Sequence, residues 1–124
     1  MRESKLWALH LFSGAALVVL LGVHMVVQHY PTILGWLGWV EGDVRSFASV
    51  AARSTSAGWS VIYVLLLGFA LYHGLYGLRR ILHEIWYSPA ATRVVDAVVV
   101  VFGLAIFVYG LVAVFQAIPL GGAS

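Results

Sequence analysis

The chain has 124 residues, of which 62% are hydrophobic and 10% are charged, and its mean hydropathy is +0.97. This composition excludes an ordinary soluble domain, because a domain of this size has too much surface for its volume to bury so many apolar side chains. The formal net charge of +2 gives no indication of nucleic-acid binding. Since the chain contains no cysteine, disulfides and thiolate ligands for a metal or cluster are excluded as well.

The first predicted element is a helix over about residues 6–28, built on the apolar run from Leu6 to Val27. At about 1.5 Å of rise per residue, such a run crosses the roughly 30 Å hydrocarbon core of a bilayer. The run is too long for the core of a signal peptide, and no convincing cleavage site follows it. We therefore expect this helix to remain in the protein as a membrane span.

The loop after this span, about residues 29–57, begins near Tyr30-Pro31 and contains Trp36 and Trp39. Indole rings prefer the headgroup layer of a membrane. The loop is therefore compatible with a short helix that lies on the membrane surface.

Two further spans are predicted in the second half of the chain, one over about residues 57–87 and the other over about residues 90–118. Ser88-Pro89 is typical of an N-cap followed by the first helical turn, and it marks the start of the third span. The predicted fold is an all-α membrane protein with three transmembrane helices in a single domain over residues 1–124.

The basic residues predict how these spans are oriented in the membrane. One face of a three-span protein carries five of them, and the other face carries two. The larger group comprises Arg2, Lys5, Arg79, Arg80 and Arg93, and the smaller one Arg45 and Arg53. Because cytoplasmic segments carry the excess of Lys and Arg, we expect a cytoplasmic N-terminus and an external C-terminus.

His73 is the most informative polar residue of the second span, because imidazole is costly in hydrocarbon without a partner. Gly77 at position i+4 leaves a flat gap on the same helix face, and Arg80 follows at i+7 with Arg79 beside it. A neutral imidazole, a flat gap and cations for propionates fit an iron porphyrin. The alternatives are a structural histidine bonded to a neighbouring helix and arginines that only anchor the cytoplasmic helix end.

His24 is the second candidate ligand for a haem iron, near the outer end of the first span. It lies roughly 27 Å along its helix from the cytoplasmic side, whereas His73 lies roughly 22 Å along its own helix from the external side. The two are then separated in depth by about 15–20 Å, too far to bind one iron. If both are ligands, they serve two haems. The alternative for His24 is an interhelical hydrogen bond.

The motifs around these histidines are similar to those of a known family. The first span carries Leu11-Phe12-Ser13-Gly14 and then Gly22-Val23-His24, and the second carries His73-Gly74-Leu75-Tyr76-Gly77-Leu78-Arg79 with Glu84 beyond it. Over roughly residues 5–87 the chain resembles the small membrane-anchor subunits of succinate:quinone oxidoreductase, respiratory complex II, and their fumarate reductase relatives. Two departures are Leu11, where the family has arginine, and Ile85, where a tyrosine usually follows the acidic residue.

The resemblance implies a non-catalytic anchor subunit in a prokaryotic cytoplasmic membrane. His73 would be an axial ligand of haem b, and in the branch with two haems His24 would ligate the second. A second anchor subunit would share the haem, and an iron–sulfur subunit and a flavoprotein would dock on the pair, with FAD and the Fe–S clusters confined to these partners. The alternatives are a cytochrome b subunit of another respiratory enzyme and a small structural or transport membrane protein without a cofactor.

The resemblance also implies a quinone site near the cytoplasmic end, between the start of the first helix and the end of the second. A quinone that is being reduced needs hydrogen-bond donors at its carbonyls and a path for protons from water. The polar groups that this chain brings to that level are His10, Ser13, Glu84 and Tyr87, with Trp7 as a wall. The alternative is that all five residues only line the headgroup layer.

Overall fold

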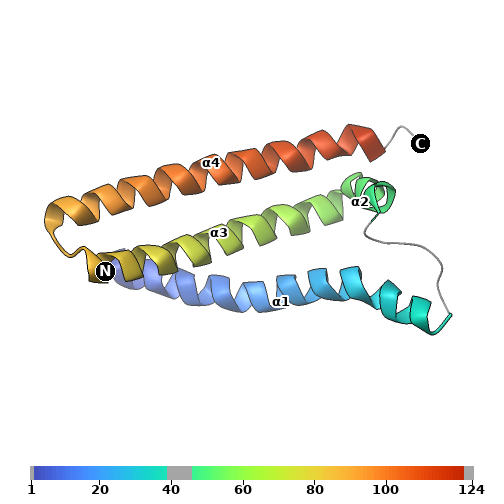
Figure 1. The fold of residues 1–124 in the computed structure, drawn as a ribbon, viewed down its shortest axis with the longest axis horizontal. Coiled ribbons are helices and arrows are strands. Elements are labelled where there is room, and N and C mark those ends of the chain that lie inside the picture. The colour runs from blue at the N-terminus through green and yellow to red at the C-terminus, as the bar shows by residue number, and fades with distance from the viewer. Residues whose placement is uncertain (1, 39–45, 122–124) are drawn as a thin grey trace.

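The computed structural model describes residues 2–38 and 46–121, and in these ranges the chain forms helices and no strand. The elements are α1 (Arg2–Trp36), α2 (Phe47–Ser54), α3 (Ala57–Ile85) and α4 (Pro89–Gly121) (Figure 1). The helices α1, α3 and α4 are each long and apolar enough to cross a membrane. The prediction of an all-α protein with three spans is therefore confirmed.

The three long helices lie side by side in one layer, with α3 in the middle (Figure 1). One side of α3 packs against α1 and the other against α4, and within the described residues α1 and α4 do not pack against each other. The start of α1 and the α3–α4 turn lie at one end of the layer, and α2 lies at the other end, near the end of α4 (Figure 1). Side chains of α3 are therefore the ones that can meet both neighbouring helices.

The helix α1 is longer than the sequence predicts, because it begins at Arg2 rather than near residue 6 and ends at Trp36 rather than near residue 28. Pro31 lies inside it. Proline removes a single backbone donor, and membrane helices tolerate this because neighbouring groups satisfy the freed carbonyl. The helix ends where Gly38 adopts a φ of 72°, the left-handed conformation that glycine accepts without steric cost.

The short helix expected in the first loop is present as α2, which packs against α3 and α4. The hydroxyl of Ser46 caps it by accepting a hydrogen bond from the backbone N–H of Ser49 at 3.3 Å. The tryptophans that suggested this helix do not belong to it. Trp36 is the last residue of α1, and Trp39 lies outside the described residues.

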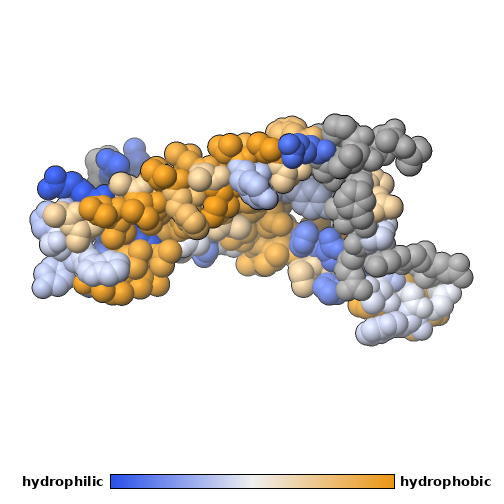
Figure 2. Space-filling view, turned by 45° about the horizontal axis from the view of Figure 1, so that its top comes forward, coloured by the Kyte–Doolittle hydropathy of each residue, from blue (hydrophilic) through white to orange (hydrophobic). Residues whose placement is uncertain are grey.

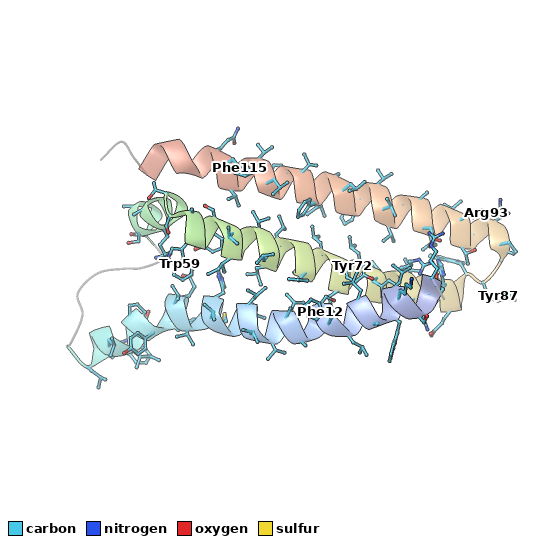
Figure 3. The ribbon with its side chains drawn as sticks, turned by 180° about the vertical axis from the view of Figure 1, so that it is seen from behind. Phe12, Trp59, Tyr72, Tyr87, Arg93 and Phe115 are labelled. Atoms are coloured by element: carbon cyan, nitrogen blue, oxygen red, sulfur yellow. The ribbon has the colours of Figure 1, made fainter. Side chains whose placement is uncertain are left out.

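The turn between α3 and α4 confirms the predicted Ser88-Pro89 start. The backbone N–H of Ala91 donates to the hydroxyl of Ser88 at 3.2 Å, and α4 begins at Pro89. Because the turn is short, α3 and α4 form an antiparallel hairpin, with Tyr87 and Arg93 both at its closed end (Figure 3).

Glycines allow α3 and α4 to approach closely. A Cβ atom added at Gly103 would lie 2.6 Å from Cδ1 of Leu75, and one added at Gly110 would collide with Leu67. Small residues at such crossings are the usual means by which membrane helices gain packing contacts. The inner side of α4 is therefore a packing surface shaped to α3.

The layer buries few side chains by itself. Among the described residues only Ser13, Tyr76 and Val95 are buried. On the face that Figure 2 shows, hydrophobic residues cover most of the length of the molecule, and hydrophilic residues gather toward the ends. Lipid covers such a surface in an integral, multi-pass membrane protein. Exposed apolar side chains of this extent also leave room for a further subunit to pack on the layer.

Candidate functional site

His73 points from α3 toward α1, where its ring lies close to two polar groups. Its Nδ1 atom lies 3.2 Å from the backbone carbonyl oxygen of His10 and 3.4 Å from Oγ of Ser13. The hydroxyl of Ser13 donates to the same carbonyl at 2.7 Å. Because a carbonyl oxygen can only accept, the bond from His73 requires a proton on Nδ1, and the lone pair of the neutral ring then lies on Nε2.

The Nε2 atom of His73 remains open. It makes no hydrogen bond within the described residues, and it is not among the buried side-chain atoms that lack a partner. Histidines that bind metals commonly donate one ring N–H to a carbonyl, which fixes the tautomer and the ring orientation, and bind through the other nitrogen. His73 therefore fits an iron ligand.

The donor set bears on which metal group His73 could serve. In the described ranges, no three His, Cys, Asp or Glu side chains are grouped to hold a metal ion. A haem iron needs only an axial imidazole from the chain, because the porphyrin supplies four nitrogens. The residues present therefore fit a haem.

His10 lies against His73 instead of facing the headgroups. The two imidazole rings are stacked, with centroids 4.1 Å apart and planes within 7° of each other. The ring of His10 also lies near the ring of Tyr76, with their centroids 5.0 Å apart. The Nδ1 atom of His10 and the hydroxyl of Tyr76 are both buried without a hydrogen-bond partner in the described residues. Sequence reasoning missed Tyr76, although its place one turn after His73 put it on a neighbouring face of the helix.

The two glycines of the second-span motif differ in their surroundings. A Cβ atom added at Gly77 would be in ordinary contact with His10, 3.6 Å from its Cε1 atom, so Gly77 faces α1. A Cβ atom added at Gly74 would meet nothing within 4 Å. The space that Gly77 leaves is therefore taken up by the ring of His10, and open space lies instead at Gly74.

A charged cluster, formed by Glu3, Arg79, His83 and Asp96, joins the three long helices near the closed end of the hairpin. Arg79 of α3 donates from Nε to Oδ1 of Asp96 at 2.6 Å and from Nη2 to Oδ2 at 3.3 Å. Its Nη1 atom lies 3.5 Å from Oε2 of Glu3 in α1. His83 adds a contact of 2.8 Å from Nε2 to Oδ1 of Asp96. Arg79 therefore connects α1, α3 and α4.

Sequence reasoning missed this cluster. The signal was present in the hairpin itself. In an antiparallel pair that turns near residue 88, residue 79 stands opposite residue 96. The two neighbouring arginines consequently differ, because the guanidinium of Arg79 is engaged by two carboxylates and the side chain of Arg80 is exposed.

His24 lies far from this site. Its ring packs edge-on against Tyr63 of α3, with centroids 6.2 Å apart. Tyr63 precedes His73 by ten residues on the same helix, which corresponds to about 15 Å of axial rise. The structure thus separates His24 and His73 by too much for one iron, as expected, and ligation by His24 stays a prediction.

The five residues predicted at a quinone site fall into two groups. His10 and Ser13 lie at the α1–α3 interface next to His73, and Ser13 is 0% exposed. The others lie toward the end of the layer. Trp7 and Tyr87 are exposed, and Glu84 lines a polar pocket of about 330 Å³ with Glu3, Arg79, Arg80 and His83.

Comparisons with known proteins place this geometry in context. The family model for the succinate dehydrogenase/fumarate reductase transmembrane subunit matches residues 2–112. Among curated proteins, the chain is 26% identical over 114 residues to the succinate dehydrogenase hydrophobic membrane anchor subunit of Archaeoglobus fulgidus. That alignment covers 92% of this chain and 90% of the relative. No solved structure matches the chain.

Proposed function

The chain belongs to the family of succinate dehydrogenase/fumarate reductase transmembrane subunits, and we propose that it is a non-catalytic anchor that binds haem b through Nε2 of His73. The observation that carries the proposal is the hydrogen bond from Nδ1 of His73 to the carbonyl of His10, which leaves Nε2 open. This arrangement supports binding of a haem iron, because a histidine with hydrogen bonds at both ring nitrogens would have no nitrogen free to bind it.

The residues around His73 have distinct parts in this proposal. When bound, haem b would supply a one-electron carrier. The carbonyl of His10 holds the tautomer of His73, and the exposed Arg80, two turns further along α3, offers a guanidinium to the propionates. Arg79 serves the charged cluster, so Arg80 is the first choice for the propionates.

The layered fold supports a role for partner chains. Because α1, α3 and α4 leave most of their large hydrophobic side chains exposed, a second anchor subunit would have room to pack on them and supply a further ligand. The iron–sulfur subunit and the flavoprotein, which hold the clusters and FAD, would dock at the end that carries the N-terminus and the α3–α4 turn. This end bears the larger group of basic residues and is therefore the cytoplasmic one in the proposal.

We expect His24 to ligate a second haem nearer the external side. The purified complex should then contain two haems per flavin, and His24→Ala should reduce this ratio to one while the haem at His73 remains. The reason is the axial gap of about 15 Å, which lets the two histidines serve separate irons. Haem extracted as its pyridine complex and flavin measured on the same sample give the ratio. One haem or none per flavin in the intact wild-type complex would exclude this role.

We also expect a quinone site at the cytoplasmic end. Ser13 is enclosed between α1 and α3, so the residues left to face a quinone are Trp7, His10, Glu84 and Tyr87. His10→Ala, Glu84→Gln or Tyr87→Phe should lower quinone reduction by about tenfold or more, because donors and proton routes contribute at least this much.

Dye-coupled succinate oxidation is the internal control for these variants, since it bypasses the quinone. A loss confined to the quinone reaction supports the site. Normal quinone reduction in all the variants would remove this chain from the pocket and assign the pocket to the partner anchor.

A further inference from the structure

The backbone of α1 approaches the ring of His73 very closely at Gly14. A Cβ atom added there would lie 3.0 Å from Cε1 and 3.2 Å from Nδ1 of His73. Such contacts are tighter than nine in ten real Cβ contacts, and they fall on a ring that already stacks on His10 with one face. A side chain at position 14 would therefore require the imidazole to shift by a few tenths of an ångström.

Ser13 holds the same ring from the polar side. A serine hydroxyl bonded to a carbonyl three or four residues earlier is common in helices and carries no function by itself. Here the carbonyl oxygen of His10 accepts hydrogen bonds from both the hydroxyl of Ser13 and Nδ1 of His73, and Ser13 is 0% exposed. Three polar groups from two helices therefore form one enclosed network.

We propose that Ser13 and Gly14 are positioning residues that form an imidazole seat on α1, together with the carbonyl of His10. Gly14 supplies the space, and Ser13 and the carbonyl supply the bonds that fix the tautomer and the ring plane of His73. The seat rests on the proposed haem function but assigns a role to the first helix, which contributes no ligand to this iron. Groups that orient a ligating histidine in this way also set its strength as a ligand.

Gly14→Ala should disturb this seat, and with it the haem site, in the assembled complex with its partner subunits. Displacement of the ring should weaken haem binding at His73 by about tenfold or more, which is the usual cost of losing a group that orients a metal-bound histidine. It should also shift the electron paramagnetic resonance signal of the low-spin haem, which reports the axial ligands. Haem retained per flavin and the position of this signal are the measurements.

The matched control is Gly68→Ala, which makes the same change in a spanning helix where the new Cβ atom meets Phe107 at an ordinary 3.6 Å. Its haem content and signal should equal those of the wild type. Ser13→Ala removes atoms and so avoids any clash, and it should shift the signal even if Gly14→Ala fails to assemble. Wild-type signal and retention in Ser13→Ala and in any assembled Gly14→Ala would overturn the seat. A haem that survives His73→Ala would instead overturn the proposed function.

Discussion

Replacing His73 with alanine is expected to abolish the low-spin haem b signal of the complex, or to prevent the complex from assembling. The substitution removes Nε2, the open nitrogen that we assign to the iron, and it also removes the bond from Nδ1 to the carbonyl of His10. Reduced-minus-oxidised optical spectra and haem per flavin measure the effect.

His29→Ala is the matched control for this experiment. His29 lies on α1 and is exposed, and no role in cofactor binding is assigned to it. This variant should keep the haem content and the spectrum of the wild type. An assembled His73→Ala complex with the same haem content and spectrum as His29→Ala would refute ligation by His73.

The second large effect is expected from Arg79 and Asp96. Asp96→Asn or Arg79→Gln should destabilise the complex, because each breaks the charge-assisted hydrogen bonds that hold α3 to α4. Such bonds contribute about 1.5–3 kcal/mol when water is excluded, and partial exposure of Asp96 places the expected loss near the lower end. Thermal dissociation of the detergent-solubilised complex, followed by size-exclusion chromatography, measures this loss.

Arg80→Gln is the informative comparison, since it removes the neighbouring guanidinium from the same helix. It should leave thermal stability unchanged but weaken haem retention and shift the haem midpoint potential, because Arg80 is the proposed partner of the propionates. If Arg79→Gln instead lowers haem retention at wild-type stability, the two assignments are reversed. If neither variant changes haem retention or potential, both arginines serve only to anchor the helix end.

The spans could be predicted from the sequence because bilayer thickness fixes the length of an apolar run. The hairpin start at Ser88-Pro89 was predictable for a local reason, since an N-cap and a first-turn proline act within one turn. The continuation of α1 through Pro31 was not predictable, because whether a proline ends a helix depends on groups outside the helix.

The contacts of the site show a similar division. The short α3–α4 turn fixes which residues stand opposite each other, so the pairing of Arg79 with Asp96 could be predicted from the position of the turn. No such constraint links α1 to α3, because a long connection lets the two helices slide and rotate against each other. His73 was therefore predictable as a candidate ligand from its own helix, and its stack on His10 and its contact with Gly14 were not.

A structure of the complete complex with its partner subunits would show directly whether His73 binds a haem. We expect a haem iron bonded to Nε2 of His73, with Nδ1 still donating to the carbonyl of His10 and a further ligand supplied by the second anchor. An intact complex in which no haem iron lies at Nε2 of His73, or in which this nitrogen is bonded to a partner side chain, would contradict it.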